Sequence, residues 1–427
     1  MKYPHIHIAG LALFMITGHQ MLAQQAVSLE TARQMALAKN NTVKAAEERI
    51  NAAKAGKELA DAAAKPKIDG SVTAFYFGKP LSQILPEYGA SPSVTVTQPI
   101  YAGGKIKLGR QVAAKGVEIE EAQKALSTVD VIFNTEQAYW NIVSAMEKVK
   151  LAVQSKKQLA ALHQDLNNQF TAGLIYKNDV LRAEVQLNDA ELSITRSKDA
   201  VYLSREVLAQ LTGLPVDEYV ITDTIQGAFG FQLADTNLST VYAARPEITI
   251  LQKNMEAAGM QKELLRADMR PTVGISAGGF AAFGKAGINP ANTSRNAMAS
   301  YYGLLSMNIP LFDWGGRKQK VQQQQFAINA QVYQLQEIKE QMAIEVKQAY
   351  IQVNQAAKRV ELSGASLQQA NENLKLSEDR FKAGTIVGKD VLEAQLIWQQ
   401  AVTAIIDAKV AYRISEAALK KALGKMD

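Results

Sequence analysis

Four short segments of the chain alternate between apolar and polar residues. In the first of them Ile68 and Val72 alternate with Asp69, Ser71 and Thr73, and a period of two residues is the pattern of a β-strand. The other three segments lie at 93–100, 272–277 and 305–311. Each has one apolar face and one face of small or polar residues. The sequence therefore predicts two pairs of strands, the first pair joined by a proline-containing loop at 78–91.

Two long stretches without proline predict helices. They run from Lys105 to Phe170 and from Lys318 to Phe381, each shortly after a pair of glycines. A continuous helix of this length spans about 100 Å. Such helices occur in coiled coils and helical barrels rather than in ordinary globular domains. A further helix is predicted from Ser28, a good residue to cap its first turn, to Ala64.

The chain repeats itself at a constant spacing. The matched pairs, all 211 residues apart, are Phe170 and Phe381, Gly173 and Gly384, Asp179 and Asp390, and Gly213 and Gly424. Self-similarity at one spacing marks a duplicated structural unit. Each unit would contain a helix, two strands, a very long helix, a turn and a returning helix. The predicted organisation is a first repeat over 24–213, a connector over 214–238 and a second repeat over 239–427.

The first 23 residues have the features of a secretory signal peptide. Lys2 precedes an apolar run from Ile8 to Ile16, and Ala23 is a small residue suited to cleavage. The alternative, a membrane anchor, needs about 20 apolar residues to cross the bilayer core, and this run is far shorter. We therefore expect an exported protein that loses residues 1–23.

The composition excludes several kinds of active site. The chain has no cysteine, and only His163 follows the expected signal peptide, so thiol chemistry and histidine clusters are missing. No nucleophile–base pair, metal cluster or ATP-binding loop is visible, and we expect no catalytic residue, metal or cofactor. The formal net charge is +6, but Lys and Arg alternate with Asp and Glu along the helices. This pattern indicates solvated helix faces rather than a nucleic-acid site.

The predicted strands are typical of a transmembrane β-barrel, whose apolar face meets lipid and whose polar face lines the lumen. Four strands cannot close a water-filled barrel, and open sheet edges are not tolerated in hydrocarbon. Other copies of the chain must then complete the wall. Tyr101, Phe312 and Trp314 lie where strands would leave the bilayer, as interfacial aromatic residues do. The alternative is a soluble β-sandwich capped by helices.

Several short segments keep the same order in both halves or open the second half. They are the strand exits at 98–104 and 309–316, Ala-Arg-Pro-Glu-Ile at 244–248, and the Phe-x-Ala-Gly turns at 170–173 and 381–384. In order and spacing they resemble the TolC family of outer membrane efflux proteins. The resemblance implies a homotrimer with a twelve-stranded β-barrel in outer membrane lipid and a periplasmic α-barrel of long helical hairpins. It also implies the exit duct of a tripartite efflux pump or type I secretion system, joined to a periplasmic adaptor protein and an inner membrane transporter.

The same resemblance assigns roles to residues near the two turns. The adaptor-docking tips would be Gly173, Leu174, Gly384 and Thr385, and an acidic constriction of the periplasmic entrance would be formed by Asp390 and Glu393. From the residues alone, a helix start explains Asp390 equally well, because an acid in the first turn interacts favourably with the helix dipole. Glu393 then adds a like charge on the same face, which a helix start does not explain.

A periplasmic adaptor protein, also rich in long helical hairpins, is the alternative function. Adaptors place a single hairpin between β-rich domains, whereas each half of this chain is predicted to place two strands between helices. An enzyme has less support, because the catalytic residue types are missing. The sequence does not distinguish drugs, metal ions and exported proteins as cargo.

Overall fold

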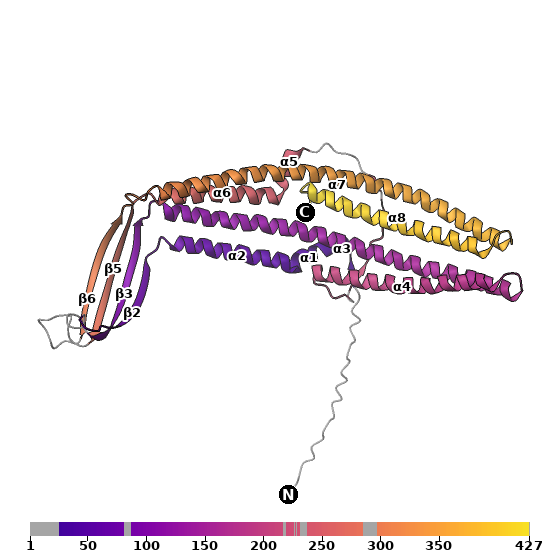
Figure 1. The fold of residues 1–427 in the computed structure, drawn as a ribbon, viewed down its shortest axis with the longest axis horizontal. Coiled ribbons are helices and arrows are strands. Elements are labelled where there is room, and N and C mark those ends of the chain that lie inside the picture. The colour runs from indigo at the N-terminus through magenta and orange to yellow at the C-terminus, as the bar shows by residue number, and fades with distance from the viewer. Residues whose placement is uncertain are drawn as a thin grey trace, which may run out of the picture.

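The described chain is elongated, with a sheet at one end and two helical hairpins at the other (Figure 1). The computed structural model describes residues 25–80, 87–216, 219–225, 227, 229–230, 237–284 and 297–426. The expected signal peptide at 1–23 lies outside the described residues. The fold therefore concerns the part that we expect to remain after export.

One antiparallel sheet contains all four predicted strands. It consists of β2 (Lys67–Tyr76), β3 (Tyr88–Tyr101), β5 (Thr272–Gly284) and β6 (Ala297–Asn308), in the order β2-β3-β5-β6. Several boundaries differ from the prediction. β3 begins inside the predicted loop, β5 continues to Gly284 instead of ending at 277, and β6 begins at Ala297 instead of 305. β6 also stops at Asn308 instead of continuing to Leu311, because Pro310 has no N–H to donate to a strand ladder.

The long helices are α3 (Lys105–Thr171) and α7 (Gly316–Lys382), each of 67 residues. They turn back as α4 (Lys177–Thr212) and α8 (Gly388–Ala422). Nearer the sheet, α3 packs on α2 (Asn41–Ala62), and α6 (Pro246–Ala267) packs between α3 and α7. Further from it, α8 contacts both α7 and α3. The four strands thus continue into helices lying side by side (Figure 1).

The N-terminal helix is broken, so the prediction of one continuous helix over 28–64 is wrong. It consists of α1 (Leu29–Lys39) and α2, separated at Asn40. The Asn40 side chain accepts a hydrogen bond from the Thr42 N–H at 2.8 Å and donates one to the Leu211 carbonyl at 3.2 Å. Asparagine at a helix N-cap satisfies a backbone donor that the helix leaves unpaired. The break therefore fixes α1 and α2 to the end of α4.

The connector contains structure that the sequence pattern did not predict. Its β4 (Tyr219–Ile221) pairs in parallel with β1 (Gln25–Val27), and α5 (Leu238–Ala244) follows. Tyr219 is fully buried, and burial raises the pKa of its hydroxyl to about 12. The Tyr139 hydroxyl, from α3, donates to the Asp223 carboxylate at 2.8 Å. The connector is thus packed into the largest core cluster, at mid-length of the helices.

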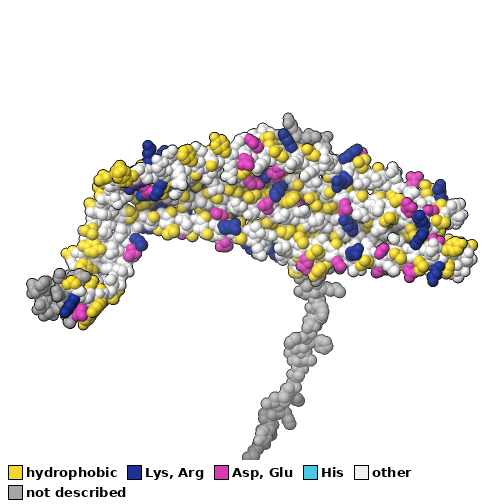
Figure 2. Space-filling view, in the orientation of Figure 1, with side chains coloured by type: hydrophobic (Ala, Val, Ile, Leu, Met, Phe, Trp, Pro, Cys, Tyr) yellow, Lys and Arg dark blue, Asp and Glu magenta, His cyan; other side chains and the backbone are white. Residues whose placement is uncertain are grey.

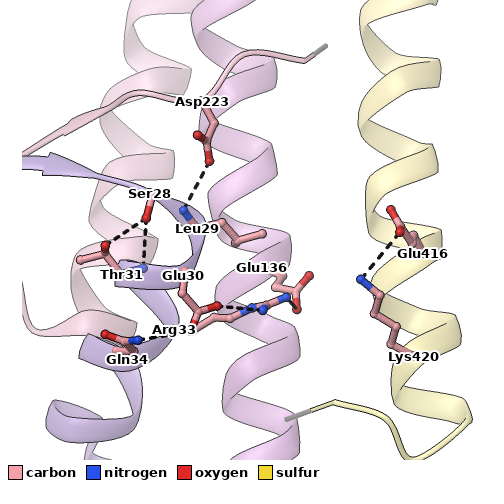
Figure 3. A network of polar contacts seen from close by, with 10 residues as sticks. All are labelled: Ser28, Leu29, Glu30, Thr31, Arg33, Gln34, Glu136, Asp223, Glu416 and Lys420. Carbon is pink, nitrogen blue, oxygen red and sulfur yellow. Dashed lines mark hydrogen bonds and ion pairs between the residues drawn. The ribbon is translucent and has the colours of Figure 1, made fainter. Parts of the chain in front are cut away.

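A polar network joins this region to the neighbouring helices (Figure 3). Asp223 accepts from the Leu29 N–H, and Arg33 lies between Glu30 and Glu136 of α3. Burial raises the pKa of the Glu136 carboxyl, and Arg33 only partly offsets this. Because an unpaired buried charge is strongly destabilising, Arg33 and Glu136 hold α1 against α3 as a pair.

Candidate functional site

Both hairpins reverse at the end of the molecule farthest from the sheet (Figure 1). Gly173 and Gly384 have φ of 73° and 72°, a conformation that glycine adopts at helix C-termini without steric strain. A Cβ at either position would meet no atom within 4 Å. Leu174 is 74% exposed, and Thr385 is also exposed. The structure therefore brings all four predicted tip residues to free, solvent-facing turns.

The predicted acidic residues lie just beyond the second turn, on the exposed surface of α8. The Asp390 carboxylate accepts a hydrogen bond from the Val387 N–H at 3.3 Å, so the helix-start interpretation of Asp390 is structurally correct. Glu393 lines a groove of about 540 Å³ between α4 and α8, opposite Arg182. The two carboxylates are therefore close to the tips and open to solvent. Their function as a constriction stays a prediction.

Gly388 is a close-packing position near the tips that the sequence reasoning missed. It is the first residue of α8 and is buried, and a Cβ there would lie 2.6 Å from Cδ2 of Leu166 in α3. Around this contact, the hairpin cluster contains Leu162, Leu166, Val180, Ala183, Phe381 and Val391. The matching position of the first repeat, 211 residues earlier, is Lys177. This difference between the two repeats is the sequence feature that could have pointed to Gly388. Glycine lets the two hairpins pack directly against each other near the tips.

Replacing Gly388 by alanine is expected to loosen the contact between the hairpins. The added Cβ would overlap Leu166, and overpacking of this kind costs about 1–3 kcal/mol. Hydrogen exchange at 380–395 should become faster. Leu166→Ala removes the opposing side chain, so Gly388→Ala/Leu166→Ala should recover part of the protection from exchange. Equal exchange rates in Gly388→Ala and the native protein would contradict this packing argument.

The two faces of the sheet differ in chemistry. On one face hydroxyl groups meet across strands: Ser71 lies 2.8 Å from Ser93, and Thr95 lies 3.2 Å from Tyr302. The other face exposes large apolar side chains, namely Ile68, Val72, Val94, Ile275, Leu305 and Met307. The strands contain 10 to 14 residues, whereas a tilted transmembrane strand needs about 9–11. The sheet therefore has the length and the amphipathic character of a membrane barrel wall.

The predicted interface aromatics lie where the sheet meets the helices. Tyr101 is the last residue of β3 and is half exposed, whereas Phe312 and Trp314 follow the end of β6 and are 73% and 92% exposed. The rings of Phe312 and Trp314 contact each other edge to face, with centroids 4.9 Å apart. Hydrophobic side chains are prominent over the strands and at this bend in Figure 2. Such an exposed aromatic pair is stable at the boundary between lipid and water.

The described part of the chain shows neither a metal-binding cluster nor a helix that could span a membrane. Within it, no group of three or more His, Asp and Glu side chains is arranged to hold a metal ion. None of the described helices combines the length and the apolar composition needed to cross a bilayer.

An amphipathic sheet that continues into helical hairpins of about 100 Å defines a channel protein of the bacterial outer membrane. The chain belongs to the outer membrane efflux protein family, whose sequence model matches residues 32–214 and 237–425. The resemblance to the TolC family is thereby confirmed.

Individual relatives align with most of this chain, and a solved structure shares its fold. The outer membrane protein TolC of Escherichia coli is 21% identical over 346 residues, which cover 79% of this chain and 70% of TolC. The alkaline protease secretion protein AprF of Pseudomonas aeruginosa is 21% identical over 342 residues, covering 78% of this chain and 69% of AprF. The crystal structure of the Campylobacter jejuni CmeC outer membrane channel superposes with a TM-score of 0.76 at 19% identity, covering 93% of this chain and 86% of CmeC. The similarity to CmeC shows the fold.

Proposed function

We propose that this protein is the homotrimeric exit duct of a tripartite efflux pump or type I secretion system, with a barrel in the outer membrane and a helical tunnel in the periplasm. The family match supports the duct over the adaptor alternative. The single observation that carries the proposal is the four-stranded amphipathic sheet whose strands continue into two hairpins of similar length. The two family matches, one in each half, support an internal duplication.

The sheet edges support assembly with other copies. β2 and β6 are the edges, and their outer N–H and C=O groups have no strand partner within the described chain. In hydrocarbon each unpaired group costs several kcal/mol, so transmembrane sheets close into barrels. β6 runs opposite to β2, which allows β6 of one copy to pair antiparallel with β2 of the next. Three copies would give twelve strands, an even number as in other bacterial barrels.

A row of apolar side chains along α7 supports the same assembly. The α7 row comprises Phe326, Tyr333, Ile344, Ile351 and Leu362, all of them exposed. The steps between them alternate between 7 and 11 residues, and 18 residues make five helical turns, so the side chains share one face. Exposed apolar surface of this extent marks an interaction site. We assign the α7 row to the seam with the neighbouring copy.

Ile351→Glu is expected to weaken the trimer, because it places a charge in this apolar seam. Burying an unpaired carboxylate is strongly unfavourable. The three-chain species in detergent should give way to monomers on native mass spectrometry. Gln352→Glu is the matched control, since the next residue of an α-helix lies about 100° around the axis. A stable trimer of the Ile351 variant would remove the α7 row from the interface.

We place the protein partners at the tips of the hairpins and the lipid around the sheet. The tips at Gly173, Leu174, Gly384 and Thr385 would contact the periplasmic adaptor, which joins the duct to an inner membrane transporter. Their open turns leave room for a partner backbone to approach. Asp390 and Glu393 would line the periplasmic entrance, repeated by threefold symmetry. Tyr101, Phe312 and Trp314 would contact the lipid interface where the sheet joins the helices.

A further inference from the structure

A polar pocket of about 270 Å³ lies where the sheet joins the helices. It is an open pocket lined by the start of α3, the end of α6, the start of β5, the end of β6 and the start of α7. Four cationic side chains line it, Lys105, Arg270, Arg317 and Lys320, together with one carboxylate, Asp268. Lys105 is thus brought next to residues that follow it by 160 or more positions in the sequence.

Two of these cations lack a carboxylate partner. Lys105 forms an ion pair with Asp268 at 2.6 Å, and Arg317 lies 3.5 Å from Asp313. Arg270 donates to the Gly103 carbonyl at 3.0 Å, which leaves its charge uncompensated. Neither Arg270 nor Lys320 forms an ion pair with any carboxylate in the described chain. The pocket therefore carries an excess positive charge.

The surrounding backbone does not offset this charge. The first turns of α3 and α7 contain no acidic residue, although the positive end of a helix dipole favours one there. The start of α3 therefore contributes potential of the same sign as the side chains, whereas at the start of α7 the Asp313 carboxylate accepts from the Gly315 and Arg317 N–H groups. Arg270 and Lys320 are exposed to solvent, and the positive charge that Asp268 and Asp313 leave uncompensated favours binding of an anion.

The pocket opens on the polar face of the sheet. Thr272 and Asn308, which line it, are paired across β5 and β6. They alternate with Val273 and Met307 of the apolar face and lie in phase with Ser306, whose hydroxyl donates to the Gly274 carbonyl. In the proposed duct this polar face lines the lumen. The pocket would then face the transport path at the junction of barrel and tunnel.

We propose that this pocket is a binding site for phosphate-bearing anions in the lumen, repeated three times as a basic collar. The inference rests on the proposed function for its position in the lumen. Guanidinium and ammonium groups are the side chains that best recognise phosphate, and Arg270 and Lys320 supply one of each. At about 30 Å³ per water, the pocket has the volume of about nine water molecules, which is enough for a hydrated phosphate ion. A basic collar between low-dielectric walls also attracts anions from solution.

The test uses the full trimer in detergent and inorganic phosphate as the probe. We expect titration calorimetry to detect phosphate binding to the native protein, with affinity at least tenfold lower in Arg270→Gln/Lys320→Gln. Lys320→Gln alone keeps the Arg270 hydrogen bond to Gly103 and should lower the affinity severalfold. Lys318→Gln is the matched control, because Lys318 is exposed on the first turn of α7 but does not line the pocket. No phosphate binding to the native protein, or an equal loss in the Lys318 variant, would overturn the site.

Conductance separates this proposal from the proposed function. In planar bilayers under a KCl gradient, the double variant should shift the reversal potential toward cation selectivity, and phosphate should no longer reduce its current. If the native trimer conducts ions but phosphate does not change its current, the phosphate site is refuted and the proposed channel function is retained. Phosphate binding by a protein that forms no three-chain channel would retain the pocket and refute the duct.

Discussion

Gly384→Arg is expected to abolish export while the protein still assembles in the outer membrane. A side chain at this turn meets open space, so it adds no clash inside the fold. The left-handed backbone adds strain of about 1–2 kcal/mol for a residue with a Cβ, which is small for a large assembly. The arginine instead adds bulk and charge to the surface where we place the adaptor. Efflux or secretion should fall to the level of cells that lack the protein, and pull-down of the adaptor should fail.

A second substitution at position 384 separates the effect of backbone strain from the effect of added bulk and charge. Gly384→Asn retains the left-handed turn, which asparagine tolerates better than other residues, and adds little bulk. It should export nearly normally. If the arginine variant assembles, binds adaptor and exports as well as the native protein, the docking surface lies elsewhere, on the flanks of the hairpins.

Neutralising Asp390 and Glu393 together is expected to weaken block of the channel by multivalent cations by about tenfold or more. Six carboxylates facing a narrow lumen in a trimer would concentrate negative potential there. Asn at 390 can still accept the hydrogen bond from the Val387 N–H, and Gln at 393 keeps the size of the side chain, so the change acts on charge. Current through planar bilayers with trivalent cations on the periplasmic side measures the block.

Glu361→Gln provides a matched control for this experiment. Glu361 is an exposed acid on α7 that pairs with Lys358 at 2.8 Å, away from the tips. Its removal should leave the block unchanged. If the Asp390/Glu393 variant also retains full block, the two acids contribute only to the start of α8, and the constriction lies elsewhere.

The long elements were predictable because their signals extend over many residues. The two 67-residue helices begin and end within two residues of the predicted positions, since glycine pairs and the Phe-x-Ala-Gly turns delimit them. The strand faces were predictable from their period of two. The order β2-β3-β5-β6, by contrast, depends on the pairing of β3 with β5, which no local pattern encodes.

The features that escaped prediction depend on contacts between distant residues. Asn40 breaks a helix-forming segment because its amide reaches Leu211, 171 residues away. β1 and β4 are three residues long, too short to show a period, and they are defined by each other and by the core around Tyr219. Glycine is required at position 388 because Leu166, far away in the sequence, packs directly against it. Leu174 and Thr385 were placed correctly at the tips, whereas their role in docking is still a prediction.

In the proposed trimer, β6 of one copy pairs with β2 of the next. Disulfide cross-linking tests it directly, because the chain has no cysteine of its own. Ser71→Cys on β2 would be combined in turn with Ser300→Cys, Leu304→Cys and Ser306→Cys on β6, all on the polar face. Non-reducing gels should then show dimers and trimers and nothing larger, for at least one pair. Exclusively monomeric chains for every pair, in membranes where the protein is present, would contradict the closed barrel.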